Sequence, residues 1–335
     1  MSEYQFVAFR AIDGPVSEKN LKYMEKQSTR AEITRWSFEN EYHFGDFRGN
    51  ALEMMRRGYD IHLHYANFGI RSLFLRFPKG LPDHDAAKPY LDGDSLQFKK
   101  DKRGPGGTLA IEPFYEPGDL EELWDLDEMV DDLIPIRKEI QAGDTRPLYL
   151  AHLAICCDCN HDPDEQMEGP VPPGLEKPTN AQLALASFYW IGKALIAAAA
   201  RPDRSSAGDN HRRTVAQLRS EAKEIENKSA RRKAAADAQA RARLLAKMAE
   251  NPTPFLLKTE QLVVERSTNA YGKASSLLAD LREALSESDK SDLAEMQARK
   301  LHDAHPQFRG LTAALRREGF IPKPAKRTAR PRSQN

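Results

Sequence analysis

All three cysteines of the chain lie in one short segment that also contains two histidines. The segment HLAICCDCNHD (residues 152–162) places Cys156, Cys157 and Cys159 between His152 and His161. Structural zinc normally binds two short pairs of thiolate or imidazole ligands that a folded loop brings together. His152 and Cys156 would share one helical face, but Cys159 and His161 would have to close the site from the turn directly after it. This spacing favours a helix end with buried small side chains and one exposed thiol. We therefore predict no bound metal, and a fold that tolerates replacement of the cysteines.

Two further histidines stand two residues apart in an apolar run, YDIHLHYANFG. His62 and His64 would share one face of a strand, as in some metal and hydrolytic sites. His43, Asp46 and Asn67 could lie nearby if the segments 33–44 and 61–68 pair. The intervening residues form an apolar core face: Ile61, Leu63 and Tyr65. We therefore place the histidines on the outer face of a sheet, where substitution is tolerated. An enzyme that uses His43, His62 and His64 is the least supported function.

The sequence contains none of the common catalytic motifs considered next. The segment RGPGGT (103–108) lacks the G-x-x-x-x-G-K-[ST] spacing of a phosphate loop, and strand-like flanks make it a hairpin loop. No serine stands in a G-x-S-x-G frame, and no H-E-x-x-H occurs. We predict no catalytic residue, no cofactor and no small-molecule substrate.

A long basic helix is the remaining feature. Residues 212–250 contain no Gly or Pro and are rich in Ala, Arg, Lys and Glu, a helix-forming composition. Its basic residues form two clusters, Arg231, Arg232 and Lys233 and then Arg241, Arg243 and Lys247. Binding to phosphate needs only positive charge, whereas base readout or single-strand stacking would need Asn, Gln or aromatic residues among them. The pattern favours a solvated face that docks on an acidic protein surface. One such surface is the helix that bears Glu121, Asp125, Glu128 and Asp132.

The first 115 residues predict an α+β fold, an antiparallel or mixed sheet with short helices on one face. Strand patterns occur at 4–12, 36–44, 59–69, 71–78 and 95–116, and Ser17 and Asn50 cap short helices. An all-α helical region follows. Its expected parts are a helical segment (116–205) with a Pro/Gly-rich linker (160–180), a helical domain (206–320) that contains the basic helix, and a disordered basic tail (321–335). Gly319 is placed to end the last helix.

The net charge and the cysteine cluster indicate which compartment and which general classes of partner to expect. Lys and Arg total 50, as do Asp and Glu, so no overall charge attracts the chain to nucleic acid or membranes. The charges are segregated, however, with 116–132 acidic and 211–247 and 321–335 basic. Clustered cysteines and the lack of a signal sequence indicate the cytoplasm. Lys193 interrupts the apolar run 183–200, and inserting its charge at the centre of a membrane would cost roughly 2.5–3.5 kcal/mol. We therefore expect this run to form a buried helix capped by Asn180, and we expect no membrane partner.

Two resemblances accompany these patterns. The segments YQFVAFRAIDGPVSEKNL, STRAEITRWSF, YHFGDFRGN and YDIHLHYANFGIRSLFLRFP together resemble the N-terminal region of an uncharacterised bacterial protein family, over roughly the first 120 residues. That resemblance implies no activity. The helical stretch from AYGKASSLLADL to LRREGF is similar to the tail of bacterial SWIM zinc-finger proteins. A SWIM site pairs a C-x-C motif with a later C-x-H motif, and a loop separates the two. Here Cys159 would belong to both motifs, and no loop lies between them.

The function expected from the sequence is that of a non-enzymatic intracellular protein-interaction protein, an adaptor or scaffold. The sheet domain would be a rigid module, and the helical region would bind the protein partner. Sequence-independent nucleic-acid binding by the basic helix and tail is the alternative.

Overall fold

The computed structural model describes residues 4–116, 123, 125–157, 162, 164–201 and 213–322, in two compact units. Unit 1 is Met1–Lys228 and unit 2 is Ser229–Asn335. The sequence had suggested boundaries near 115 and 205. In the structure the helices that follow the sheet share its core, because their apolar faces pack directly on the strands. The expected tail lies almost wholly outside the described residues.

A seven-stranded antiparallel sheet forms the centre of unit 1, in the order β2-β3-β1-β4-β5-β7-β6. This confirms the α+β prediction of a sheet with short helices followed by a helical region. The strands are β1 (Gln5–Arg10), β2 (Glu32–Ile33), β3 (Ser37–Tyr42), β4 (Ile61–Ala66), β5 (Ile70–Phe77), β6 (Leu96–Lys100) and β7 (Gly107–Ile111). Sequence-adjacent strands pair as hairpins at β4–β5 and β6–β7, and the RGPG part of RGPGGT lies in the turn of the second hairpin, as predicted, while Gly107 and Thr108 begin β7.

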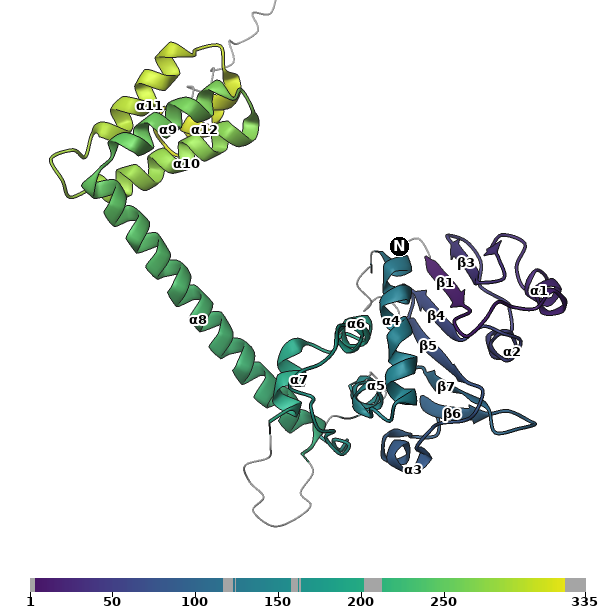
Figure 1. Ribbon diagram of the computed structural model, residues 1–335. Helices are drawn as coiled ribbons and strands as arrows, with labels where there is room; N and C mark the ends of the chain where they lie inside the picture. Colours follow the sequence, from purple (N-terminus) through teal and green to yellow (C-terminus); the bar gives the residue numbers. More distant parts are fainter. Residues whose placement is uncertain are drawn as a thin grey trace, which may run out of the picture. The chain divides into compact units, whose positions relative to one another are not determined.

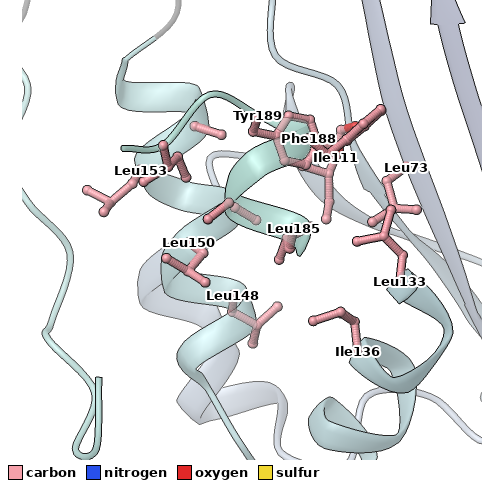
Figure 2. Close-up of a cluster of buried hydrophobic side chains, with 14 of the residues drawn as sticks. Leu73, Ile111, Leu133, Ile136, Leu148, Leu150, Leu153, Leu185, Phe188 and Tyr189 are labelled. Atoms are coloured by element: carbon pink, nitrogen blue, oxygen red, sulfur yellow. The ribbon is translucent and has the colours of Figure 1, made fainter. Parts of the chain in front are cut away.

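Helices cover both faces of the sheet, which corrects the expectation of helices on one face (Figure 1). On one face α4 (Leu126–Gln141), α5 (Arg146–Cys156) and α6 (Asn180–Phe188) build the larger core, part of which Figure 2 shows. On the other face α1 (Glu18–Met24) and α2 (Ala51–Arg56) cover a second core. Strand residues alternate between the two cores: Phe6 and Ala8 belong to the first, Val7 and Phe9 to the second. The short α3 (His84–Ala87) and the 3-10 helix η1 (Lys88–Tyr90) precede β6.

The apolar run 183–200 folds as two helices, not as the single helix expected. Helix α6 ends at Phe188, and α7 (Lys193–Ala199) starts after a bend of 115°. Trp190 lies in the bend with a left-handed φ of 57°. Thr179, one residue before the expected Asn180, caps α6 with a full capping box. No single helix among the described residues is long and apolar enough to cross a membrane, and only the bent α6–α7 pair meets the length and composition together.

Unit 2 is helical, with a core of its own. The end of α8 (Val215–Glu250) packs with α9 (Thr253–Val264), α10 (Thr268–Leu285), α11 (Leu293–Ala304) and α12 (Arg309–Arg317). Buried residues recur along α10 at helical spacing, Ala274, Leu278, Leu281 and Leu285, so one face of this helix lines the core. Gly319 adopts φ 80° directly after α12, as its predicted capping role requires.

Candidate functional site

The six predicted basic residues lie on α8 within unit 2. Every residue of the segment 229–243 is exposed, and none of them is an apolar residue larger than Ala. A helix without an apolar face gains little from packing. This segment therefore depends on the high helix propensity of Ala, Arg, Lys and Gln. Its side chains are accessible to a partner on all sides.

Arg241 is the one residue of the six with an ion pair inside unit 2. Its Nη2 lies 2.7 Å from Glu283 Oε2 and 3.0 Å from Asp280 Oδ1, both on α10. These carboxylates, Glu283 foremost, raise the pKa of the Arg241 guanidinium. Arg241 therefore marks the side of α8 that faces α10.

Charge is divided between the two units. Residues 229–335 contain 21 Lys and Arg against 12 Asp and Glu, so the other 228 residues contain 29 against 38. The net charge of zero is thus the sum of an acidic unit 1 and a basic unit 2. Within unit 1, α4 carries exposed Asp127, Glu128, Asp131 and Asp132, and Asp125 precedes it. Asp131 lies 3.7 Å from Arg10. Glu121, part of the predicted acidic surface, is outside the described residues.

His62 and His64 are not on an outer face, and this prediction was wrong. Both rings lie against aromatic residues of the second core, which α1 and α2 cover, with His62 buried and His64 half-buried. The His62 ring stacks on Phe9 at 3.9 Å between centroids, and its Nδ1 lies 3.0 Å from the carbonyl oxygen of Ala8. The alternation of the strand was interpreted correctly. What the sequence did not reveal is that two short helices cover the opposite face.

The proposed cluster of His43, His62 and His64 does not form either. Strand β1 lies between β3 and β4, so the two segments expected to pair are separated by a strand. Gln5 of β1 instead connects His64 to Asp46. Its Oε1 lies 3.1 Å from His64 Nε2, and its Nε2 donates to Asp46 Oδ1 at 2.8 Å. His43 is exposed and packs on Tyr4.

Burial keeps the two core histidines neutral. Loss of water lowers the pKa of His62 to about 3, and neighbouring His64 adds to the effect. Loss of water also lowers the pKa of His64 to about 4, although Asp46 opposes the shift. A neutral imidazole packs like an aromatic core side chain, as His62 does on Phe9, whereas half-buried His64 also contacts Gln5.

The cysteine segment shows one contact that its spacing indicated. Cys156 is buried, and its Sγ lies 3.3 Å from His152 Nε2 across one helical turn of α5. The other imidazole nitrogen, Nδ1, lies 3.2 Å from the carbonyl oxygen of Tyr90. Cys159 and His161 lie outside the described residues. Among the residues that are described, no group of three or more His, Cys, Asp or Glu could hold a metal ion. The prediction of a metal-free segment remains a prediction.

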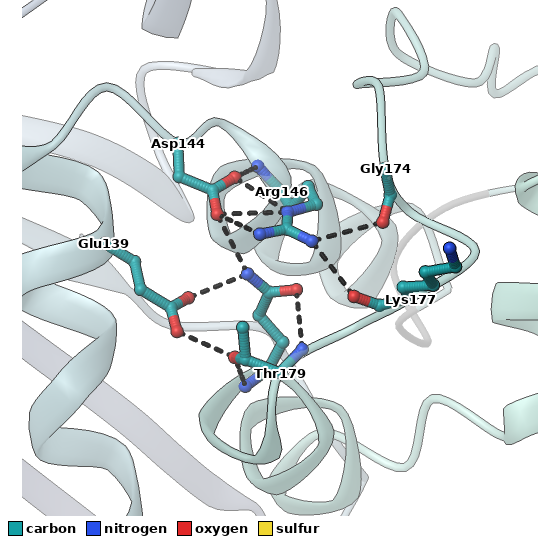
Figure 3. Close-up of polar contacts among 7 residues, drawn as sticks. Glu139, Asp144, Arg146, Gly174, Lys177 and Thr179 are labelled. Carbon is teal, nitrogen blue, oxygen red and sulfur yellow. Dashed lines mark hydrogen bonds and ion pairs between the residues drawn. The ribbon is translucent and has the colours of Figure 1, made fainter.

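Two buried polar networks could not be predicted from the sequence. Arg213 contacts Glu168 at 2.8 and 3.0 Å, and Tyr149 donates to the same carboxylate. A second network surrounds the start of α6, where Glu139 accepts from Thr179 and Gln182, and Asp144 accepts from Arg146 (Figure 3). The partners are up to 45 residues apart in sequence, and no local pattern indicates such pairs. Both networks fix loops to the core of unit 1.

Comparisons with known proteins add no assignment. No family model, no curated protein and no solved structure matches this chain. The exposed surface of α8 and the positive charge of unit 2 are the features that bear on function.

Proposed function

We propose that the chain is a non-enzymatic interaction protein whose unit 2 binds a polyanionic partner through α8. The observation that carries this proposal is the exposed, basic segment 229–243 without a large apolar side chain. Protein interfaces usually contain aromatic or apolar anchors and are depleted in Lys, Glu, Asp and Ala. A partner of this segment would therefore be held by charge. An acidic protein surface and a nucleic-acid backbone both offer that chemistry, and the clustered cysteines support the cytoplasm as the location.

The test compares two triple variants with the same change in net charge. Arg231, Arg232 and Lys233 are changed to Gln in one variant, and the exposed Lys258, Lys290 and Arg299 of unit 2 in the other. Binding of labelled polyglutamate and labelled duplex is titrated by anisotropy at about 50 and 200 mM salt. We expect salt-sensitive binding that the α8 variant weakens by about tenfold and the control variant by much less. Equal losses, or no saturable binding at the lower salt, would refute the proposal.

A second candidate is docking of a protein on the apolar side chains of α9 and α11. Leu257, Val264 and Met296 are 54%, 70% and 62% exposed. Helices α9 and α11 are adjacent there, since Lys300 Nζ lies 2.7 Å from Glu260 Oε1. Exposed apolar residues of this size are typical of protein contact surfaces when they gather in one patch. Capture of one protein partner that Met296→Lys and Leu257→Lys abolish, while the α8 variant does not, would favour this candidate.

A further inference from the structure

The ion pairs of Arg241 define an outward face of α8. At about 100° of rotation per residue, Arg232 stands about 180° from Arg241 and Arg243 about 160°. Arg241 points towards α10, so Arg232 and Arg243 point away from it. Lys247 stands about 120° from Arg241, on the same outward side. We call Arg232, Arg243 and Lys247 the outward cations.

Small residues separate the outward cations. Ala236 and Gln239 lie about 140° and 160° from Arg241, on the same side of the helix, and both are exposed. A face made of Ala and Gln between cations lets a partner approach the helix backbone closely. Arg232 and Lys247 are 15 positions apart, or about 22 Å along the axis at about 1.5 Å per residue. The outward cations therefore form a row of charge along one side of the helix.

We propose that this face binds the phosphate backbone of double-stranded nucleic acid, independently of sequence. The inference rests on the proposed polyanion binding and names the partner class. A duplex is a stiff polyanion with one charge about every 1.7 Å, so cations spaced along one side of a helix can meet several phosphates without ordering the partner. A single strand or a disordered acidic segment has to be ordered, which weakens binding.

The composition of the segment favours the duplex over a single strand for a second reason. Single-strand binding relies on aromatic side chains on which bases stack. No Phe, Tyr or Trp occurs between residues 229 and 254. Sequence readout would require several side chains that reach base edges, and Gln239 is the one amide side chain on the outward face. Contacts to phosphate alone are therefore expected.

The experiment uses the full chain and two matched variants, Ala236→Glu and Ala234→Glu. Ala236 is on the outward face, whereas Ala234 is about 20° from Arg241 on the opposite side. Both positions are exposed, and the two variants have the same net charge and similar helix propensity. Labelled duplex DNA, the corresponding single strand and polyglutamate of similar charge are titrated at about 100 mM salt.

We expect the duplex to bind about tenfold more tightly than either other polyanion. Ala236→Glu should weaken duplex binding about tenfold, and Ala234→Glu less than about threefold. Equal affinities for the three polyanions, or equal effects of the two substitutions, would overturn this inference and leave polyanion binding by unit 2 intact. If none of the three binds, both proposals fail. If polyglutamate binds most tightly, the partner is an acidic protein and the duplex assignment is wrong.

Discussion

His62 and His64 make the stability of unit 1 dependent on pH, because both are neutral in the folded chain. Their pKa values are lowered to about 3 and about 4 by burial, whereas in the unfolded chain both return to about 6.5. Below about pH 6.5 the unfolded chain therefore binds protons that the folded chain does not. Stability should be fully present above that pH and should fall as the pH drops towards 4. Urea midpoints at about pH 7.5, 6 and 5 measure the slope.

A conservative variant isolates one of the two histidines. His64→Gln keeps a polar partner for Gln5 and removes one titrating group from the core. The loss of stability between about pH 6.5 and 5 should then be roughly halved. The same pH slope in the variant and the wild-type chain would show that the pKa of His64 is not lowered in the folded chain.

Glu168 supports a buried ion network, so its removal should be costly. Glu168 is 3% exposed, and the side chain of its partner Arg213 is 9% exposed. Glu168→Ala would leave the guanidinium buried beside only Glu221 and two carbonyl groups. Breaking one side of such a pair costs about 3–5 kcal/mol. Chemical denaturation of unit 1 in the full chain measures this loss.

The exposed pair of Lys300 and Glu260 is the matched control. Its distance of 2.7 Å is as short as that of the buried pair, but Lys300 is 67% exposed. Lys300→Ala should therefore change stability by less than about 1 kcal/mol. Similar losses for Glu168→Ala and Lys300→Ala would contradict the role assigned to burial.

Trp190 lies in the bend between α6 and α7, and its backbone conformation should make glycine more favourable than alanine there. Its φ of 57° is left-handed, and its ring lies 3.7 Å from the buried Arg71 guanidinium. Trp190→Ala and Trp190→Gly both remove the ring and should destabilise unit 1. Glycine has no Cβ to strain at this φ, so the Gly variant should be more stable than the Ala variant by about 1 kcal/mol. Urea denaturation of both variants checks the order, and a more stable Ala variant would refute the argument.

Helix α8 should be the least protected long helix of unit 2. Amides of 229–240 are covered by no buried side chain, whereas Ala274, Leu278 and Leu281 of α10 are fully buried. Local opening of α8 therefore exposes no core. Hydrogen exchange should be faster in 229–240 than in α10, and Ala236→Gly should accelerate it further, since Gly costs about 1 kcal/mol in a helix. Protection equal to that of α10 would mean that α8 packs on something else.

The elements of this fold could be predicted where one local pattern decides them. The core face of β4 formed by Ile61, Leu63 and Tyr65 and the caps Ser17 and Asn50 are such cases, and the structure confirms them. The second core could not be predicted, because α1 and α2 are too short for their periodicity to show which face they cover. The bend at Trp190 was missed since a continuous apolar run hides it. The exposure of the basic segment 229–243 agrees with its composition, but the pairing of Arg241 with α10 depends on residues about 40 positions away.

At the scale of the whole molecule, the two units have separate cores, so their unfolding should be separable. Leu133 is fully buried in the core of unit 1, and Leu281 in that of unit 2. Each Leu→Ala change should cost about 2–5 kcal/mol, confined to the unit that contains it. Calorimetry of the full chain should then show two transitions, with Leu133→Ala lowering one and Leu281→Ala the other. Because segment 229–243 is exposed, neither core variant should change polyanion binding at temperatures below the unfolding transition of the unit that carries the substitution. A single transition that both variants shift equally would mean that the chain unfolds as one cooperative body.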